Sequence, residues 1–241
     1  MVKYKTLIFD LDDTLIDNNE SVKFAFKVIS KELGVDYTDS LFKNWKAFDI
    51  EYWHGWESDK IPIPKSIINL EDKITYLRAN RFKLFFKNLD LSLKKCSDIN
   101  ELYCEMLGEN IVEIDGASTL LSELKNNYKI YIGTNGPKNA AIKKLEKAKL
   151  DSFILDVVSS EEVGFSKPKE EFFNFLIDKM ETKSKSEMLL VGDSLSTDVL
   201  GGMNNNIDTC WFNYKNETLP QEFKPTYTIN KLLELKRKIK M

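Results

Sequence analysis

The sequence predicts an α/β protein whose core is a doubly wound parallel sheet, interrupted after its first strand by an inserted all-helical domain. After about residue 93, short apolar runs alternate with helical stretches of roughly 10 to 15 residues, a pattern typical of parallel sheets. Between about residues 21 and 90, apolar residues recur every three or four positions, as in helices that bury one face. The 241 residues suffice for one such core with an insertion.

The first strand is expected at residues 4–9, a short apolar run that ends in acidic residues. Further strands are expected at 129–133, 156–159, 188–191, 209–212 and 226–229, with helices at 117–127, 138–149 and 169–179. Within the helical block, Ile61-Pro62-Ile63-Pro64 is expected to connect two helices, because proline cannot occupy a helix interior. We therefore expect a core formed by residues 1–17 and 93–241 and a helical domain formed by residues 18–92.

The composition argues against several classes of function. Lys and Arg total 35 against 38 Asp and Glu, so no global positive field would attract a nucleic acid polymer or an anionic membrane. The longest run without a charged residue, Val199 to Ile207, is too short for a membrane span, which needs about 20 apolar residues. Asp10 interrupts the first apolar run, so no signal peptide is indicated and a cytoplasmic protein is expected.

The chemistry of the chain is expected to rest on carboxylates. Its three cysteines form no Cys-x-x-Cys pair, and its single histidine, His54, cannot build a His-rich metal site. Polar side chains do follow the expected strands, and ligands bind at the carboxyl ends of the strands in an open parallel sheet. We expect these side chains to converge on one cleft. They are Asp10, Asp12, Thr134, Asn135, Lys167 and Asp193.

This set of residues suits metal-assisted phosphoryl transfer. Asp10 and Asp193 can hold one Mg²⁺, a hard cation that prefers oxygen ligands. The metal and Lys167 would neutralise phosphate charge in the transition state. Thr134 offers a hydroxyl, and Asn135 a backbone N–H, to the phosphoryl oxygens.

Three further roles follow from position along the chain. Asp10 is placed as an in-line nucleophile that forms an aspartyl-phosphate. Asp12, two residues along an extended segment, points elsewhere; it can protonate the leaving oxygen and then activate the water that hydrolyses the intermediate. Asp198, five residues after Asp193, can orient Lys167 or a metal-bound water.

Four segments of the sequence occur in a characteristic order. They are Asp10-Leu11-Asp12-Asp13-Thr14-Leu15, Thr134-Asn135-Gly136, Lys167-Pro168, and Gly192-Asp193-Ser194 with Asp198. In this order they resemble the four motifs of the haloacid dehalogenase-like hydrolases. The resemblance covers essentially the whole chain and implies a Rossmann-like core. The helical block resembles the small cap of the subfamily that inserts it after the first motif.

The resemblance also implies a role for each matching residue. Asp10 would be the nucleophile and a magnesium ligand, and Asp12 the acid and base, with its backbone carbonyl as a further ligand. Thr134 and Lys167 would hold the phosphate, and Asp193 would be the remaining protein ligand of the metal. Asp12 also favours phosphate esters, because family members that displace halide from carbon usually lack this second carboxylate.

A narrower likeness lies in the second half of the chain. Residues 159–168, 198–204 and 209–213 resemble the bacterial 5′-nucleotidase branch that dephosphorylates nucleoside monophosphates, pyrimidine ones especially. The expected function is thus that of a Mg²⁺-dependent phosphomonoesterase acting on nucleoside 5′-monophosphates through an aspartyl-phosphate. The expected partner is this small phosphate ester, and the sequence does not indicate an oligomeric state.

Several alternatives stay open on the sequence alone. The chain could be another small-molecule phosphatase, acting on a sugar phosphate or phosphoglycolate, or a related phosphomutase. A phosphate-binding module without catalysis would keep the fold, although the full set of acidic residues argues against it. Gly192-Asp193-Ser194-Leu195 also matches a serine-esterase motif, but that interpretation needs a histidine base, and only His54 exists.

A series of aromatic residues in the helical block recurs at helical spacing. The series is Phe42, Trp45, Phe48, Tyr52, Trp53 and Trp56. Burial inside a small bundle is the simpler interpretation. The sharper hypothesis is that Trp53 and Trp56 line the cleft and stack on a nucleotide base.

Overall fold

The computed structural model describes the backbone of residues 3–57 and 60–239, and the side chains of all of these except residues 54, 56, 57, 70 and 71. The chain forms two compact units. One consists of residues 1–20 and 111–241 and contains the whole sheet, and the other consists of residues 21–110 and is helical. We call them the core unit and the helical unit.

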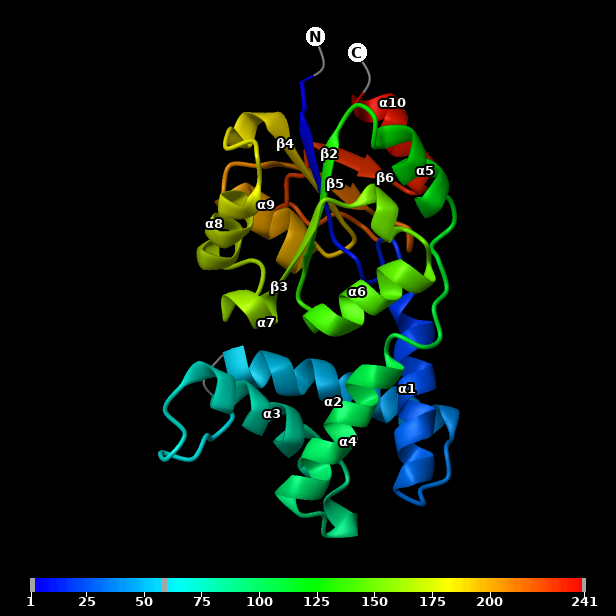
Figure 1. Cartoon of the computed structure of the whole chain (residues 1–241), viewed down its shortest axis with the longest axis vertical. Coiled ribbons are helices and arrows are strands. Elements are labelled where there is room, and N and C mark those ends of the chain that lie inside the picture. The colour runs from blue at the N-terminus through cyan, green and yellow to red at the C-terminus, as the bar shows by residue number, and fades with distance from the viewer. Residues whose placement is uncertain (1–2, 58–59, 240–241) are drawn as a thin grey trace. The chain divides into compact units, whose positions relative to one another are not determined.

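The core unit contains a six-stranded parallel sheet with the strand order β3-β2-β1-β4-β5-β6 (Figure 1). Its strands are β1 (Thr6–Phe9), β2 (Lys129–Thr134), β3 (Asp156–Ser159), β4 (Met188–Gly192), β5 (Asp208–Phe212) and β6 (Tyr227–Ile229). All six expected strands are present within one or two residues of their expected ends. The predicted fold class, a Rossmann-like parallel sheet with an inserted helical unit, is confirmed.

Helices lie between consecutive strands from β1 to β5, as is usual for the long crossovers that parallel pairing needs, whereas residues 213–226 join β5 to β6 without a helix. The helices of the core unit are α5 (Ala117–Leu124), α6 (Lys138–Lys147), α7 (Ser160–Val163), α8 (Glu170–Lys179), α9 (Leu200–Asn204) and α10 (Leu235–Ile239). Shorter turns lie at η2 (Asp151–Phe153), η3 (Lys185–Glu187), η4 (Leu195–Val199) and η5 (Leu232–Glu234). Helix α6 is two residues shorter than expected, because the backbone leaves the helix and Lys149 adopts a left-handed φ of 58°.

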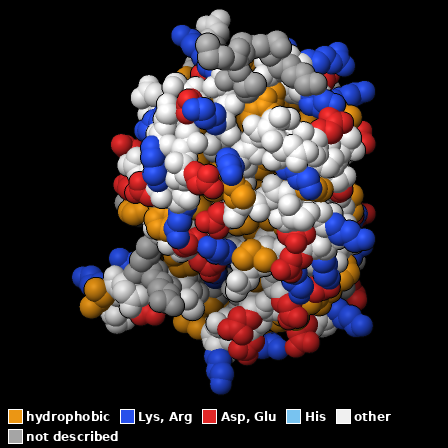
Figure 2. Space-filling view, turned by 45° about the horizontal axis from the view of Figure 1, so that its top comes forward, with side chains coloured by type: hydrophobic (Ala, Val, Ile, Leu, Met, Phe, Trp, Pro, Cys, Tyr) orange, Lys and Arg blue, Asp and Glu red, His pale blue; other side chains and the backbone are white. Residues whose placement is uncertain are grey.

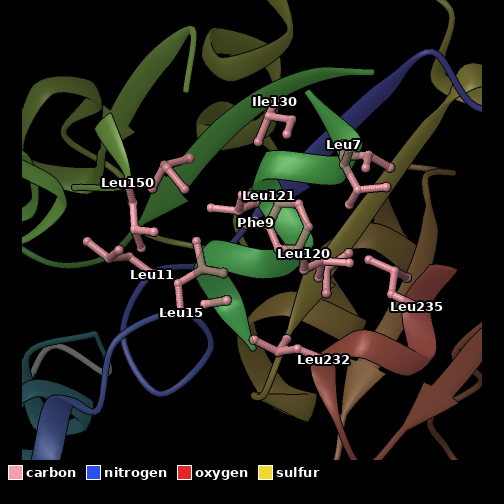
Figure 3. Packing of buried hydrophobic residues seen from close by; sticks show 14 of the residues in the cluster. Leu7, Phe9, Leu11, Leu15, Leu120, Leu121, Ile130, Leu150, Leu232 and Leu235 are labelled. Atoms are coloured by element: carbon pink, nitrogen blue, oxygen red, sulfur yellow. The ribbon is translucent and has the colours of Figure 1, made fainter. Parts of the chain in front are cut away.

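Alternate residues of each strand point to opposite faces of the sheet, so the core unit has two apolar layers. On one face, Leu7 and Phe9 of β1 pack among residues of α5, η5 and α10 (Figure 3). On the other face, Ile8 packs among residues of α8, including Phe172 and Phe173. Both faces of β1 are therefore buried, and the strand holds the residues that follow it in a fixed position.

The order of the strands places one pair of strand ends at the centre of the core unit. The chain runs outward from β1 to β2 and β3, and then returns to β4 on the other side of β1. The reversal falls between β1 and β4, and such switch points are where open parallel sheets bind ligands. The residues after Phe9 and after Gly192 lie at this point.

The helical unit is larger than the sequence suggested. Its helices are α1 (Asn18–Glu32), which begins in the core unit, α2 (Asp39–Glu57), α3 (Leu70–Phe85) and α4 (Leu93–Met106), with the short turn η1 (Lys87–Leu89). The expected boundary at residue 92/93 was wrong, because α4 belongs to the helical unit. Tyr103 of α4 packs edge-on against Trp45 and Phe82, and this burial holds α4 against α2 and α3.

Aromatic rings form the centre of the helical unit. Trp45 is fully buried and stacks on Phe26 and Phe82, and Phe42 and Tyr52 are buried as well. For these residues, burial in a bundle is the observed role. In the parts of the chain that the structure describes, no helix is long and apolar enough to cross a membrane. Figure 2 shows acidic and basic side chains interspersed over the visible face rather than gathered by sign.

Candidate active site

The candidate active site begins where β1 ends. The backbone N–H of Asp10 donates to the carbonyl of Val191 in β4 at 2.9 Å, which extends the ladder of the sheet by one residue. Asp10 is buried, and Asp193 follows the last residue of β4 directly. Because β1 lies beside β4, the two aspartates face each other at the switch point of the sheet.

A buried lysine joins Asp10 to a second acid. Lys167 Nζ donates to Asp10 Oδ1 at 2.6 Å and to Asp198 Oδ1 at 2.7 Å. Lys167 and Asp198 are 2% and 1% exposed, so this is a charged network taken almost wholly out of water. The second oxygen of Asp198 accepts the backbone N–H of Ser194 at 3.2 Å. Both oxygens of Asp198 are therefore occupied by protein donors.

Asp193 is held through its backbone rather than its side chain. Its N–H donates to Thr14 Oγ1 at 3.2 Å, and its carbonyl accepts the indole N–H of Trp211 at 2.8 Å. Thr14 also donates to Asp10 Oδ2 at 3.3 Å and so bridges the two aspartates. The Asp193 carboxylate itself accepts no hydrogen bond from the part of the chain that the structure describes.

Burial of so many carboxylates changes their proton affinity. Burial raises the pKa of Asp193 to about 8, and the charges of Asp10 and Asp198 add to the effect. Burial also raises the pKa of Asp10 to about 7, against the opposing charge of Lys167. For Lys167, burial alone would lower the pKa, but the carboxylates of Asp10 and Asp198 outweigh it and raise the pKa. The site is therefore short of positive charge.

This shortage fits a divalent cation. Oxygen atoms of Asp10, Asp193 and Asp198 lie within 4.8 Å of one another. Both oxygens of Asp10 and of Asp198 accept protein hydrogen bonds, whereas the Asp193 carboxylate accepts none from the described residues, so Asp193 has the most capacity left to bind an ion. Asp10 and Asp193 remain the expected ligands. An all-oxygen, carboxylate donor set is what Mg²⁺ prefers. The Asp12 side chain is not in this cluster, and the resemblance assigned only its backbone carbonyl to the metal.

The end of β2 supplies the two residues expected to bind phosphate. Thr134 is buried, and its Oγ1 accepts the backbone N–H of Gly136 at 2.9 Å. The side-chain amide of Asn135 makes two hydrogen bonds to the backbone of Lys167. Its oxygen accepts from the Lys167 N–H at 2.8 Å, and its nitrogen donates to the Lys167 carbonyl at 3.2 Å. Sequence reasoning credited Asn135 only with a backbone N–H, whereas its amide also fixes the loop that carries Lys167.

Asp12 turns away from Asp10 and meets a different lysine. Lys144 Nζ of α6 donates to Asp12 Oδ1 at 2.5 Å and to Asn18 Oδ1 at 3.1 Å. The Asp12 side chain is 25% exposed, so water reaches it more readily than the buried acids Asp10 and Asp198. The chain thus separates two aspartates only two residues apart into different surroundings.

Three residues of the site escaped sequence reasoning. Thr14 and Trp211 could not be linked to Asp193 from sequence, because both contacts depend on the order of the strands. Lys144 did leave a signal in the sequence. It stands three residues after Ala141 and directly before Leu145, on the apolar side of its helix, where a lysine needs a partner.

The remaining sequence hypotheses concern Ser194 and the two tryptophans. The hydroxyl of Ser194 accepts the backbone N–H of Thr197 and caps the following turn, a structural role. Trp53 lies in the helical unit, half-buried, with its ring 5.6 Å from that of Tyr52 and 5.4 Å from the guanidinium of Arg81. The side chains of Trp56 and His54 lie outside the described residues.

The switch point of this parallel sheet carries an acidic cluster that suits a cation, beside a buried lysine. Such a site is typical of enzymes that act on anionic groups. The model of the haloacid dehalogenase-like hydrolases matches residues 4–204, which is most of the chain. The protein therefore belongs to the haloacid dehalogenase-like hydrolases.

Individual relatives match over nearly the full length. The chain is 31% identical to HAD-hydrolase YfnB of Bacillus subtilis over 98% of this chain and 95% of the relative. It is 28% identical to pyrimidine 5′-nucleotidase YjjG of Escherichia coli over 98% of each chain. Pyrimidine 5′-nucleotidase PynA of Streptococcus pneumoniae is also 28% identical, over 94% of this chain and 91% of the relative.

A solved structure supports the same assignment. The crystal structure of YfnB superimposes with a TM-score of 0.85 and 30% identity, covering 99% of this chain and 100% of that one. That structure is described as bound to magnesium and as revealing interdomain movement.

Proposed function

We propose that this hydrolase is a Mg²⁺-dependent phosphomonoesterase that hydrolyses nucleoside 5′-monophosphates through an aspartyl-phosphate on Asp10. The observation that carries the proposal is the position of Asp10 beside the carboxylate of Asp193, which accepts no hydrogen bond from the described residues. Asp10 is bound to a buried lysine, and a second acid lies two residues along. This arrangement provides a nucleophile, positive charge for the phosphate and a separate proton donor.

In the first step, a carboxylate oxygen of Asp10 attacks phosphorus and forms an acyl-phosphate bond. The bond between phosphorus and the ester oxygen breaks, and Asp12 gives its proton to the departing oxygen, which leaves as an alcohol. Lys167 stays beside Asp10 and stabilises negative charge on the phosphoryl group. Thr134 and Asn135 are the proposed holders of the phosphoryl oxygens.

In the second step, Asp12 acts as a base. It takes a proton from water, the oxygen of that water attacks phosphorus, and the acyl-phosphate bond breaks to restore the Asp10 carboxylate and release phosphate. Mg²⁺, held by Asp10 and Asp193, would draw negative charge from the phosphoryl oxygens. Asp198 keeps Lys167 in position throughout, through the 2.7 Å ion pair.

The choice of nucleotides as substrates is supported by the relatives named pyrimidine 5′-nucleotidase and by the likeness of residues 159–168, 198–204 and 209–213 to that branch. A relative named glyceraldehyde 3-phosphate phosphatase matches as well. We further propose Trp53 and Trp56 as the residues that stack on the base. Trp53→Ala would then lower kcat/KM for a nucleotide more than for a small phosphate ester, and equal losses would reject the stacking role.

The proposal is tested with initial rates on UMP, dUMP, dTMP, AMP, glucose phosphates and phosphoglycolate, with Mg²⁺ and with EDTA. We expect a nucleoside monophosphate to give the highest kcat/KM, EDTA to abolish turnover, and Asp10→Asn to be inactive. A phosphoglycolate preference of several orders of magnitude would overturn the substrate assignment. Full activity of Asp10→Asn would overturn the mechanism.

A further inference from the structure

The two aspartates that open the site are each held by a different buried lysine. Lys167 binds Asp10 from the loop after α7, and Lys144 binds Asp12 from α6. Lys144 is 2% exposed, although it stands on a helix whose other lysines are far more accessible. The reaction steps given above use Lys167 but leave Lys144 without a role.

Burial of the Lys144 ammonium calls for an explanation, because a charge removed from water is costly unless it is paired. In the residues that the structure describes, Asp12 is the one carboxylate that pairs with Lys144, and the neutral carbonyl of Asn18 is its second acceptor. The partner of the buried charge is therefore the proposed acid and base itself.

The contacts of Asp12 are different at its two oxygens. Oδ1 accepts the ammonium of Lys144. Oδ2 lies over Gly136, where an added Cβ would stand 3.2 Å from it and 3.3 Å from Thr134 Oγ1. Oδ2 and the Thr134 hydroxyl thus flank the same glycine at the end of β2. A carboxylate whose Oδ1 is anchored presents Oδ2 toward the residues proposed to hold phosphate.

We propose that Lys144 is a positioning residue, which anchors Oδ1 of Asp12 so that Oδ2 carries the proton delivered to the leaving oxygen. This inference rests on the proposed phosphomonoesterase activity. As the bond from phosphorus to the ester oxygen breaks, the proton moves from Asp12 Oδ2 to that oxygen, and the electron pair of the broken bond stays on it. Without Lys144, the Asp12 carboxyl loses the contact that fixes its orientation.

The leaving group provides a readout that a merely structural role would not move. Benzyl phosphate and p-nitrophenyl phosphate have similar shapes, but benzyl alkoxide is strongly basic and must be protonated, whereas nitrophenolate departs without a proton. The kcat/KM values report only the transfer of the phosphoryl group to Asp10, so the later hydrolysis of the intermediate does not obscure them.

The experiment measures kcat/KM for both esters with wild type, Lys144→Met and Lys138→Met. Methionine keeps most of the length of lysine without its charge. We expect Lys144→Met to lose on the order of 10²-fold on benzyl phosphate, the scale of a misplaced catalytic group, and less than about threefold on p-nitrophenyl phosphate. Lys138 lies on α6, like Lys144, and pairs with Glu162 of α7. Lys138→Met therefore also removes one ion pair of this helix, and it should leave kcat/KM for both esters unchanged.

Two further variants keep the test decisive if Lys144→Met unfolds, which a thermal melt would show. Asn18→Ala removes the second acceptor of Lys144 and should lower kcat/KM for benzyl phosphate selectively, by a smaller factor. In an Asp12→Asn background, Lys144→Met should have no further effect on benzyl phosphate, because a residue that acts through Asp12 cannot add to its loss.

Each outcome decides one question. Equal losses on the two esters, or additive losses with Asp12→Asn, would overturn the positioning role of Lys144 while leaving the phosphomonoesterase proposal intact. A wild-type enzyme that hydrolyses neither ester nor any nucleotide would overturn the proposed function, and the inference about Lys144 with it.

Discussion

The contact between Gly192 and Asp198 allows the positioning of Lys167 to be tested by adding a single carbon atom. Gly192 ends β4, and a Cβ built there would stand 2.7 Å from the Cβ of Asp198 and closer still to its carboxylate. Ordinary contacts begin at 3.4 Å and Asp198 Oδ2 would stand 2.2 Å from the new Cβ, so in Gly192→Ala the carboxylate of Asp198 must move by about 1.2 Å. The backbone resists a compensating shift, because β4 is paired with β1 as far as Val191 and Gly192 itself is paired with Trp211 of β5.

A shift of this size matters because the affected ion pair is buried. Asp198 meets Lys167 at 2.7 Å, and neither side chain has water nearby to replace the lost contact. Disturbing a buried pair costs up to about 3 kcal/mol of stability. Misplacement of the lysine beside the nucleophile by about 1 Å costs on the order of 10²-fold in rate.

The assay compares kcat/KM on the preferred phosphate ester and the free energy of unfolding in urea for wild type, Gly192→Ala and Gly133→Ala. Gly133, near the end of β2, is the control, because the nearest atoms to an added Cβ are side-chain carbons of Leu176, Phe172 and Ile8 at 3.3, 3.4 and 3.6 Å. We expect the control to keep its activity within about threefold. If Gly192→Ala matched wild type in both measurements, the inferred link from Gly192 through Asp198 to Lys167 would be wrong.

Two further predictions concern the metal. Burial raises the pKa of Asp193 to about 8 and that of Asp10 to about 7, both from 3.8, so the folded metal-free protein retains protons that the unfolded chain releases. Its stability should therefore fall as pH rises from about 4 to 8. The gain in Tm from added Mg²⁺ should grow from pH 6 to 8, because protons compete with the ion for the carboxylates. Thermal melts measure this gain, and a gain that does not vary with pH would contradict the prediction. Trp211→Phe removes the indole donor to the Asp193 carbonyl and should weaken Mg²⁺ binding about tenfold, measured by calorimetry, whereas unchanged affinity would show that Thr14 alone fixes Asp193.

The elements of the core unit were largely predictable because their signals are local. A strand buried on both faces is an unbroken apolar run, as in Met188 to Val191, and a helix shows its periodicity within ten residues. The expected boundary at 92/93 was wrong because it depends on a contact between segments that are distant along the chain. The apolar face of α4 shows that the helix packs against something, but not whether Tyr103 meets the sheet or the rings around Trp45.

The same distinction between local and long-range signals applies to the candidate active site. The motif residues could be selected because acids and hydroxyls directly after buried strands are unusual, and parallel strands bring their carboxyl ends together. The hydrogen bonds and ion pairs between these residues could not be predicted in this way. Asn135 was assigned a backbone donor, yet its amide binds the backbone of Lys167, which is 32 residues away along the chain.

The sequence by itself determined the class of the sheet, the presence of a helical insertion and the acidic chemistry at the strand ends, since each depends on residues that are neighbours along the chain. Only the tertiary structure decided that Lys167 serves Asp10 while Lys144 serves Asp12. These contacts span 157 and 132 residues, and the order in which the strands pair, rather than any local pattern, brings each ammonium to its carboxylate.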